Sequence, residues 1–174
     1  MCEHPENDAN EIIPNLWLGN IKAAYNQEFL KTYNIKNVLT IMDDFDNKYK
    51  YNSITYLVIP IKDEHSCSKD MINIFNIATN FIYNSLQNNE PILVHCKKGH
   101  HRSAALVVAF LIKYLNVDYL LALRYINYLR PCAVRRNTCM GNHLFKYYLH
   151  INNIKTCKIE CNISNKVYNC KCKK

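Results

Sequence analysis

Residues 91–115 place two apolar runs on either side of a short polar stretch, and this arrangement strongly constrains the fold. The first run, PILV at 91–94, is short and continuous, as expected of a strand buried on both faces of a sheet. The second run, AALVVAFLIKYL at 104–115, is long enough and apolar enough to form a buried helix. The polar residues between them, HCKKGHHRS at 95–103, are therefore expected to form a tight loop from the end of a strand to the start of a helix.

The same alternation of strands and helices runs through most of the chain. Short apolar runs predict strands, and longer runs with apolar residues three and four apart predict helices. The expected strands are residues 15–18, 37–42, 54–61 and 91–96, and the expected helices are residues 22–34, 69–87, 103–115, 118–129 and 140–150. This alternation favours an α/β fold with a central sheet flanked by helices.

The loop offers a nucleophile and a ring of groups that attract an anion. A free thiol has a pKa of about 8.5, and a helix N-terminus or nearby cations lower this pKa to about 3.5–7.5. Cys96 would lie beside both, because the amides of residues 97–102 can form a nest for an oxyanion and the following helix adds its positive dipole end. Arg102 carries a planar fork that binds two phosphate oxygens at once. These features suit attack on a phosphoryl group.

Three further residues of the loop are expected to support that chemistry. Gly99 permits a backbone angle that other residues avoid, and Ser103 can donate a hydrogen bond to the sulfur. His95 could fix the loop through a hydrogen bond to the backbone near Cys96. The alternative, an inert core thiol at a strand end, is disfavoured by the glycine, the arginine and the serine at these spacings.

HCKKGHHRS matches the His-Cys-x5-Arg-Ser/Thr signature of the cysteine-dependent protein tyrosine phosphatase superfamily. Residues 11–150 resemble its small dual-specificity branch in the segments IIPNLWLGNIKAA, VVAFLI, RP and NHLF, which begin at residues 12, 107, 130 and 142. The resemblance implies a protein tyrosine phosphatase-like fold around a mostly parallel, twisted sheet. It also implies that Cys96 is the nucleophile, that Ser103 stabilises its thiolate, and that Arg102 clamps a phosphate bound by the loop residues Lys97, Lys98, Gly99, His100, His101 and Arg102.

The resemblance also requires a general acid on a separate loop, because an expelled alkoxide or phenolate is a poor leaving group. In this branch an aspartate that follows a strand ahead of the cysteine has that role. The expected strand 54–61 is followed by KDEHS, and Asp63 lies 33 positions before Cys96. Asp63 is therefore the expected general acid and base, with Glu64 as the alternative. A second acidic cluster is expected to lie in a surface loop, at Asp43, Asp44 and Asp46.

The composition changes near the two ends of the chain. Residues 1–10 are expected to form a short polar arm, residues 11–150 the catalytic domain, and residues 151–174 a basic tail rich in cysteine, lysine and asparagine. The tail holds six lysines and four cysteines, Cys157, Cys161, Cys170 and Cys172. Their spacing differs from common zinc fingers, which favours free thiols over a zinc site. No metal or other cofactor is expected, because the loop amides and Arg102 supply the electrostatic stabilisation.

The net charge of +8 brings polyanionic substrates into consideration. Lys97, Lys98, His100 and His101 make the loop itself basic, which would suit an RNA 5′-triphosphate or a phosphoinositide. Tyrosine-specific relatives carry an extra N-terminal segment that deepens the pocket, and no such segment is seen ahead of residue 11. A shallow pocket favours phosphoproteins that carry phosphotyrosine, phosphoserine or phosphothreonine. A non-catalytic phosphoprotein-binding module is the remaining alternative, although the cysteine, the arginine and the acid are all present.

The sequence also gives expectations about location. No apolar run approaches the length of a membrane span, and the polar N-terminus lacks the apolar core of a signal peptide. Nine cysteines without such a signal favour a reducing compartment. The bias towards Asn, Ile, Lys and Tyr resembles that of AT-rich genomes, including those of large DNA viruses. We therefore expect a monomeric cytoplasmic enzyme, acting in the host cytoplasm if the chain is viral.

Overall fold

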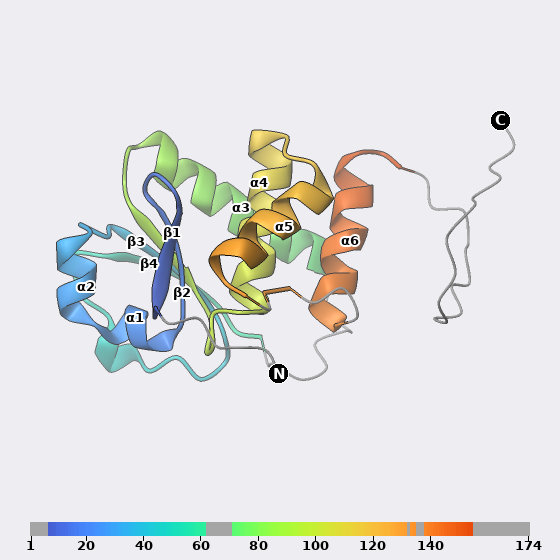
Figure 1. Cartoon of the computed structure of the whole chain (residues 1–174). Coiled ribbons are helices and arrows are strands. Elements are labelled where there is room, and N and C mark those ends of the chain that lie inside the picture. Colours follow the sequence, from blue (N-terminus) through green and yellow to red (C-terminus); the bar gives the residue numbers. More distant parts are fainter. Residues whose placement is uncertain (1–6, 62–70, 132, 135–137, 155–174) are drawn as a thin grey trace, which may run out of the picture.

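Five strands form one sheet in the computed structural model, which describes residues 7–61, 71–131, 133–134 and 138–154 (Figure 1). The strands are β1 (Ala9–Ile13), β2 (Leu16–Gly19), β3 (Asn37–Ile41), β4 (Thr55–Ile59) and β5 (Ile92–His95). Their order across the sheet is β1-β2-β5-β3-β4. β1 is antiparallel to β2, and the other neighbouring pairs are parallel. The expected α/β fold with a mostly parallel sheet is confirmed, and β5 lies in the middle of that sheet.

Helices cover both faces of the sheet. They are α1 (Ile21–Tyr25), α2 (Gln27–Thr32), α3 (Met71–Gln87), α4 (Arg102–Leu115), α5 (Tyr119–Leu129) and α6 (Cys139–Ile151), with a 3-10 turn η1 (Asn47–Tyr49). On one face, Leu30 of α2 is buried in a cluster with Val38 of β3 and Leu93 of β5. Leu39 and Val94, the next residues along the same strands, belong to the larger core that includes α3 to α6. Successive strand residues therefore serve opposite faces of the sheet.

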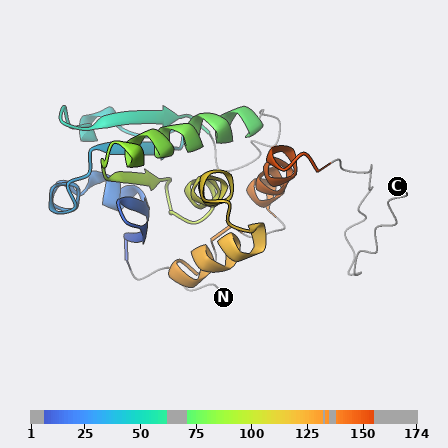
Figure 2. The same ribbon diagram turned by 90° about the horizontal axis from the view of Figure 1, so that it is seen from above.

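The helix α4 forms the centre of the larger core. Its residues from Arg102 to Ile112 are all buried. Figure 2 looks along α4 and shows α3, α5 and α6 around it, and α4 packs against each of them and against β5. A helix that is apolar on all sides needs such an interior position. Although α4 is apolar, no helix among the described residues is both long and apolar enough to cross a membrane.

Two predicted boundaries differ from the structure. The single helix expected at 22–34 is two helices, because the side chain of Asn26 accepts a hydrogen bond from the backbone amide of Phe29 at 3.1 Å and caps the start of α2. β1 begins at Ala9, inside the segment expected to be a polar arm, because its backbone pairs with β2 as far as Gly19. The tail beyond residue 154 lies outside the described residues.

His95, the last residue of β5, is held by its neighbour in the sheet. It is paired in register with Thr40 of β3, and its Nε2 lies 2.7 Å from the Thr40 hydroxyl oxygen. The sequence predicted a bond to the backbone near Cys96, and a backbone hydrogen bond at Cys96 does act on this imidazole, with Thr40 as a further, side-chain partner. His95 is fully buried, and burial lowers its pKa from 6.5 to about 4. The imidazole is therefore neutral at physiological pH.

The buried imidazole predicts a pH dependence of folding stability. Because the pKa of His95 is lower in the folded state, the unfolded chain binds more protons between pH 6.5 and about 4. Its contribution to stability is complete above pH 6.5 and is lost as the pH falls towards 4, by about 3 kcal/mol. Urea unfolding of His95→Asn should show a shallower loss over this range than the wild type. The variant His150→Asn, on the exposed surface of α6, controls for loss of an imidazole, and equal slopes for His95→Asn and wild type would contradict the prediction.

Candidate active site

The loop between β5 and α4 lies where the parallel strands end. β2, β3, β4 and β5 all finish at this edge of the sheet, which is the lower edge in Figure 1. In α/β sheets this edge is the usual place for a ligand. β5 ends at His95, Cys96 follows at once, and α4 begins at Arg102. The loop is therefore enclosed by a central strand on one side and a buried helix N-terminus on the other.

Two hydrogen-bond donors converge on the sulfur of Cys96. The backbone amide of Gly99 donates to Sγ at 3.2 Å, and the Ser103 hydroxyl donates to Sγ at 3.2 Å. The side chain is 3% exposed, so these donors act in a largely dehydrated setting. Among the described cysteines, Cys96 is a free thiol, whereas Cys139 at the start of α6 is disulfide-bonded. The arrangement suits a sulfur that carries negative charge.

Gly99 meets two requirements that other residues could not meet. Its φ of +72° lies in the left-handed region, as the sequence analysis expected. A Cβ at this position would also lie 2.6 Å from the carbonyl oxygen of Gly19. That oxygen belongs to the backbone of β2, at its last residue, and cannot move aside cheaply. Gly99 therefore fixes how closely the loop can lie against the end of β2.

Arg102 is turned towards the end of β4. Its Nη1 donates to the backbone carbonyl of Ile61 at 2.7 Å, and the side chain is buried. Ile61 is the last residue described before the gap at 62–70. The predicted acid Asp63 and its alternative Glu64 lie outside the described residues. In the sequence, Lys62 alone stands between Ile61 and Asp63.

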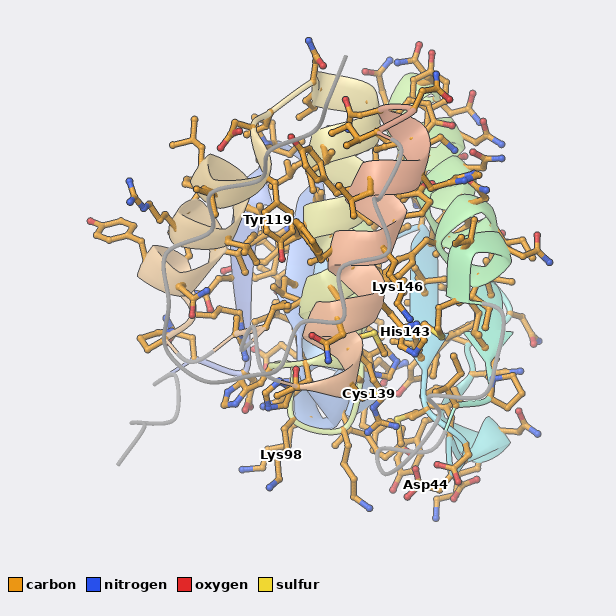
Figure 3. All side chains as sticks on the ribbon, turned by 90° about the vertical axis from the view of Figure 1, so that its right-hand side faces the viewer. Asp44, Lys98, Tyr119, Cys139, His143 and Lys146 are labelled. Carbon is orange, nitrogen blue, oxygen red and sulfur yellow. The ribbon has the colours of Figure 1, made fainter. Side chains whose placement is uncertain are left out.

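The four basic residues of the loop have different surroundings. Lys97 forms an ion pair with Asp44, with 3.0 Å between Nζ and Oδ2, and this hydrogen bond lowers the pKa of Asp44. Lys98 is exposed, and Figure 3 shows it extending from the same end of the molecule as Asp44. His100 is buried, and His101 is partly buried. The loop is therefore less uniformly basic than its sequence indicates.

The structure also brings residues to the loop that the sequence analysis did not identify. Thr40 holds His95, and Asp44, which is exposed as expected for the acidic cluster, pairs with Lys97. Asp43 and Asp46 are exposed, and Asp46 pairs with Lys48 instead. Behind the loop, Arg130 and Val134 also make hydrogen bonds to it. Only Arg130 gave a signal, as part of the RP pair in the C-terminal segment.

Metal ligands are not grouped in the part of the chain that the structure describes. Within it, no three His, Cys, Asp or Glu residues are placed to share an ion. The four cysteines of the tail lie outside these residues. The groups around Cys96 are instead backbone amides, a hydroxyl and arginines, which are donors to an anion.

Comparisons with known proteins agree with this geometry. The family model for the dual specificity phosphatase catalytic domain matches residues 16–150. A probable dual specificity protein phosphatase of Dictyostelium discoideum is 36% identical over 140 residues, which cover 80% of this chain and 63% of that protein. Dual specificity protein phosphatase 22-B of Danio rerio is 35% identical over 141 residues, covering 81% of this chain and 74% of that protein.

A solved structure extends the comparison to the fold. The crystal structure of human DUSP28 matches with a TM-score of 0.76 at 20% identity, covering 86% of this chain and 99% of that one. At this identity the likeness concerns the fold alone. The chain spans less than two thirds of the Dictyostelium relative, so the shared region is the catalytic domain. Since the family model covers most of the chain, including the whole loop from Cys96 to Arg102, the chain belongs to the dual specificity phosphatase family.

Proposed function

We propose that this protein hydrolyses phosphomonoesters of tyrosine, serine and threonine in phosphoproteins through a cysteinyl-phosphate intermediate. The observation that carries the proposal is the position of the Cys96 sulfur, 3.2 Å from both the Gly99 amide and the Ser103 hydroxyl. The N-terminus of the 14-residue helix α4 adds its positive dipole end at the same point. A nucleophile is thereby placed at the base of an anion site.

In the first step the phosphate dianion binds to the loop amides and to Arg102. The Cys96 thiolate attacks phosphorus in line with the leaving group, so that an S–P bond forms as the bond from phosphorus to the leaving oxygen breaks. The loop amides and Arg102 stabilise the charge that develops on the phosphoryl oxygens, and stabilisation of this kind usually accounts for most of an enzyme's rate enhancement. The Ser103 hydroxyl, already bonded to Sγ, stabilises the negative sulfur before attack.

Asp63 supplies the proton that the leaving oxygen needs. β4 ends at Ile59, the Ile61 carbonyl is bonded to Arg102, and Asp63 follows two positions later in the sequence. In the second step its carboxylate takes a proton from water as the water oxygen attacks phosphorus. The S–P bond then breaks, the Cys96 thiolate is restored, and inorganic phosphate leaves.

Phosphoproteins are favoured over the polyanionic alternatives. The ion pair with Asp44 neutralises one of the two loop lysines, so Lys98 is the lysine of this loop left to attract a second anionic group. The comparisons also name relatives as dual specificity protein phosphatases. An RNA 5′-triphosphatase or a phosphoinositide phosphatase would use the same site with a larger contribution from the basic residues. A monomeric state and a cytoplasmic location remain predictions.

Replacing the nucleophile tests the covalent step. Cys96→Ser should abolish turnover of a generic aryl phosphate, because a serine hydroxyl in this site has no base to activate it. The loop amides and Arg102 are unchanged, so the variant should still bind inorganic phosphate in calorimetry. Turnover at the wild-type rate by Cys96→Ser would refute the scheme. If the wild type binds inorganic phosphate but shows no turnover of the aryl phosphate, the protein is instead a non-catalytic binding module.

Replacing the acid tests the role of Asp63. Asp63→Asn should lower kcat by about 10²–10⁴-fold for an alkyl phosphate, whose leaving group needs a proton. The loss should be much smaller for an activated aryl phosphate, which leaves as a stable anion. Glu64→Gln is the matched control and should stay within about threefold of wild type on both substrates. The opposite ranking of the two variants would assign the acid to Glu64.

A substrate panel tests the proposed class. Phosphopeptides carrying each of the three phosphorylated residues should give the highest kcat/KM, ahead of phosphoinositides and triphosphorylated RNA. All assays need the same ionic strength, because the net charge of +8 makes binding of polyanions dependent on salt. Asp44→Asn releases Lys97 from its ion pair. It should raise kcat/KM for the polyanionic substrates by less than about fivefold, which is the scale of an exposed ion pair. A preference for lipid or RNA in the wild type would move the assignment to that class.

A further inference from the structure

Three carbonyl groups of the phosphate loop are bonded from behind by distant parts of the chain. The Lys97 carbonyl accepts from the backbone amide of Ile21 at 3.2 Å, at the start of α1. The Gly99 carbonyl accepts from Nε of Arg130 at 3.2 Å. The His100 carbonyl accepts from the backbone amide of Val134 at 2.9 Å. These three contacts surround the side of the loop opposite its amides.

The direction of these carbonyls determines the direction of the loop amides. In a planar trans peptide, the C=O of one residue and the N–H of the next point in opposite directions. The peptide bonds among the described residues are all trans. Drawing the carbonyls of Lys97, Gly99 and His100 backwards therefore turns the N–H groups of residues 98, 100 and 101 away from these contacts, towards the open side of the loop where an anion binds.

Among these three contacts, only that of Arg130 comes from a side chain. Burying this charged side chain costs folding free energy. It follows α5, is fully buried, and bonds to oxygens of Gly99, Asn10, Leu18 and Asn7, with the shortest distance of 2.6 Å to Oδ1 of Asn10. It forms no ion pair with the described residues. Burial lowers its pKa to about 10, and attraction to Cys96 and Asp8 opposes this, so the guanidinium is charged at pH 7. Among the described residues its hydrogen-bond acceptors are neutral oxygens, and a buried cation without a bonded anion adds little to stability.

Val134 carries a second cost at the same place. Its φ is +45°, although a β-branched residue rarely adopts the left-handed region. Such strain amounts to about 1–3 kcal/mol and persists where the surroundings require it. Here it lets the Val134 amide reach the His100 carbonyl, four residues after Arg130 reaches Gly99. A short segment thus bears both a buried charge and a strained backbone at the back of one loop.

We propose that Arg130 is a positioning residue, which holds the loop amides towards the phosphate by anchoring the Gly99 carbonyl to the β1–β2 hairpin. This inference rests on the proposed function, since it concerns the same anion site. Arg130 does not touch the substrate. It acts through the loop backbone, and Asn10 of β1 holds its other end. Loss of the anchor should weaken binding of the transition state more than binding of the substrate, because the amides carry the developing charge.

The test uses Arg130→Met, Arg130→Lys and, as a matched control, Arg124→Met on the exposed surface of α5, the helix that ends just before Arg130. In the Cys96→Ser background, Arg130→Met should weaken binding of inorganic phosphate by about tenfold in calorimetry, and Arg130→Lys should recover part of it. In the active background, Arg130→Met should lower kcat by about 10²-fold, with a smaller rise in KM. All measurements are made well below the unfolding temperature of each variant. If Arg130 only stabilised the fold, Arg130→Met would lower the melting temperature but would leave kcat and KM unchanged.

Several outcomes would overturn the inference. The inference is wrong if Arg130→Met folds and both its phosphate Kd and its kcat lie within about twofold of those of Arg124→Met. If Arg130→Met does not fold, Asn10→Ala and Arg130→Lys decide the question. We expect each to lose about threefold or more in phosphate affinity, and values within about twofold of the control for both would count against Arg130. If the Cys96→Ser parent binds no phosphate, the proposed function itself fails, and the inference fails with it.

Discussion

The burial of α4 is the constraint on which the rest of the structure depends. Its residues from Arg102 to Ile112 have no exposed face, so the helix cannot slide or tilt without opening the core to water. β5 is equally fixed, because β2 and β3 pair with it on both sides. Only Cys96 and the five residues after it separate these two elements. The loop must therefore bridge a fixed gap, and the sulfur at its start is held against the Gly99 amide and the Ser103 hydroxyl.

The charged and titratable side chains near the sulfur differ in their charge and in their partners. His95 precedes the cysteine but is neutral, since burial lowers its pKa to about 4. The positive charge comes instead from Arg102, which is bonded to the Ile61 carbonyl, and Arg130, which lies behind the loop. Lys97 is paired with Asp44. With a pKa of about 10, Arg130 keeps its charge across the physiological range, whereas an imidazolium would not. The proposed nucleophile thus does not need a protonated histidine beside it.

Local pattern was enough to predict the parts of the structure whose determinants are contiguous. The strand β5, the loop and the helix α4 lie within one stretch of sequence. The glycine at position 99 predicted a left-handed backbone angle, which the structure has. Contacts between distant residues left no such signal. Thr40 precedes His95 by 55 residues, and Arg130 follows Gly99 by 31. These pairs depend on the order of the strands and their register, which periodicity does not determine. The expected helix 22–34 failed for a smaller reason, a single asparagine cap at residue 26.

The proposed acid, Asp63, illustrates why separation along the chain is a weak guide to separation in space. Asp63 and Cys96 are 33 residues apart, and much of that length is taken up by the 17-residue helix α3, which packs on the sheet. The bond from Arg102 to the Ile61 carbonyl holds the chain, two residues after β4 ends, beside the residue proposed to clamp the phosphate. Insertions within α3 or its flanks would lengthen the separation without moving that point. The requirement is therefore an acidic residue within a few positions of Ile61, and Asp63 and Glu64 are the carboxylates that satisfy it.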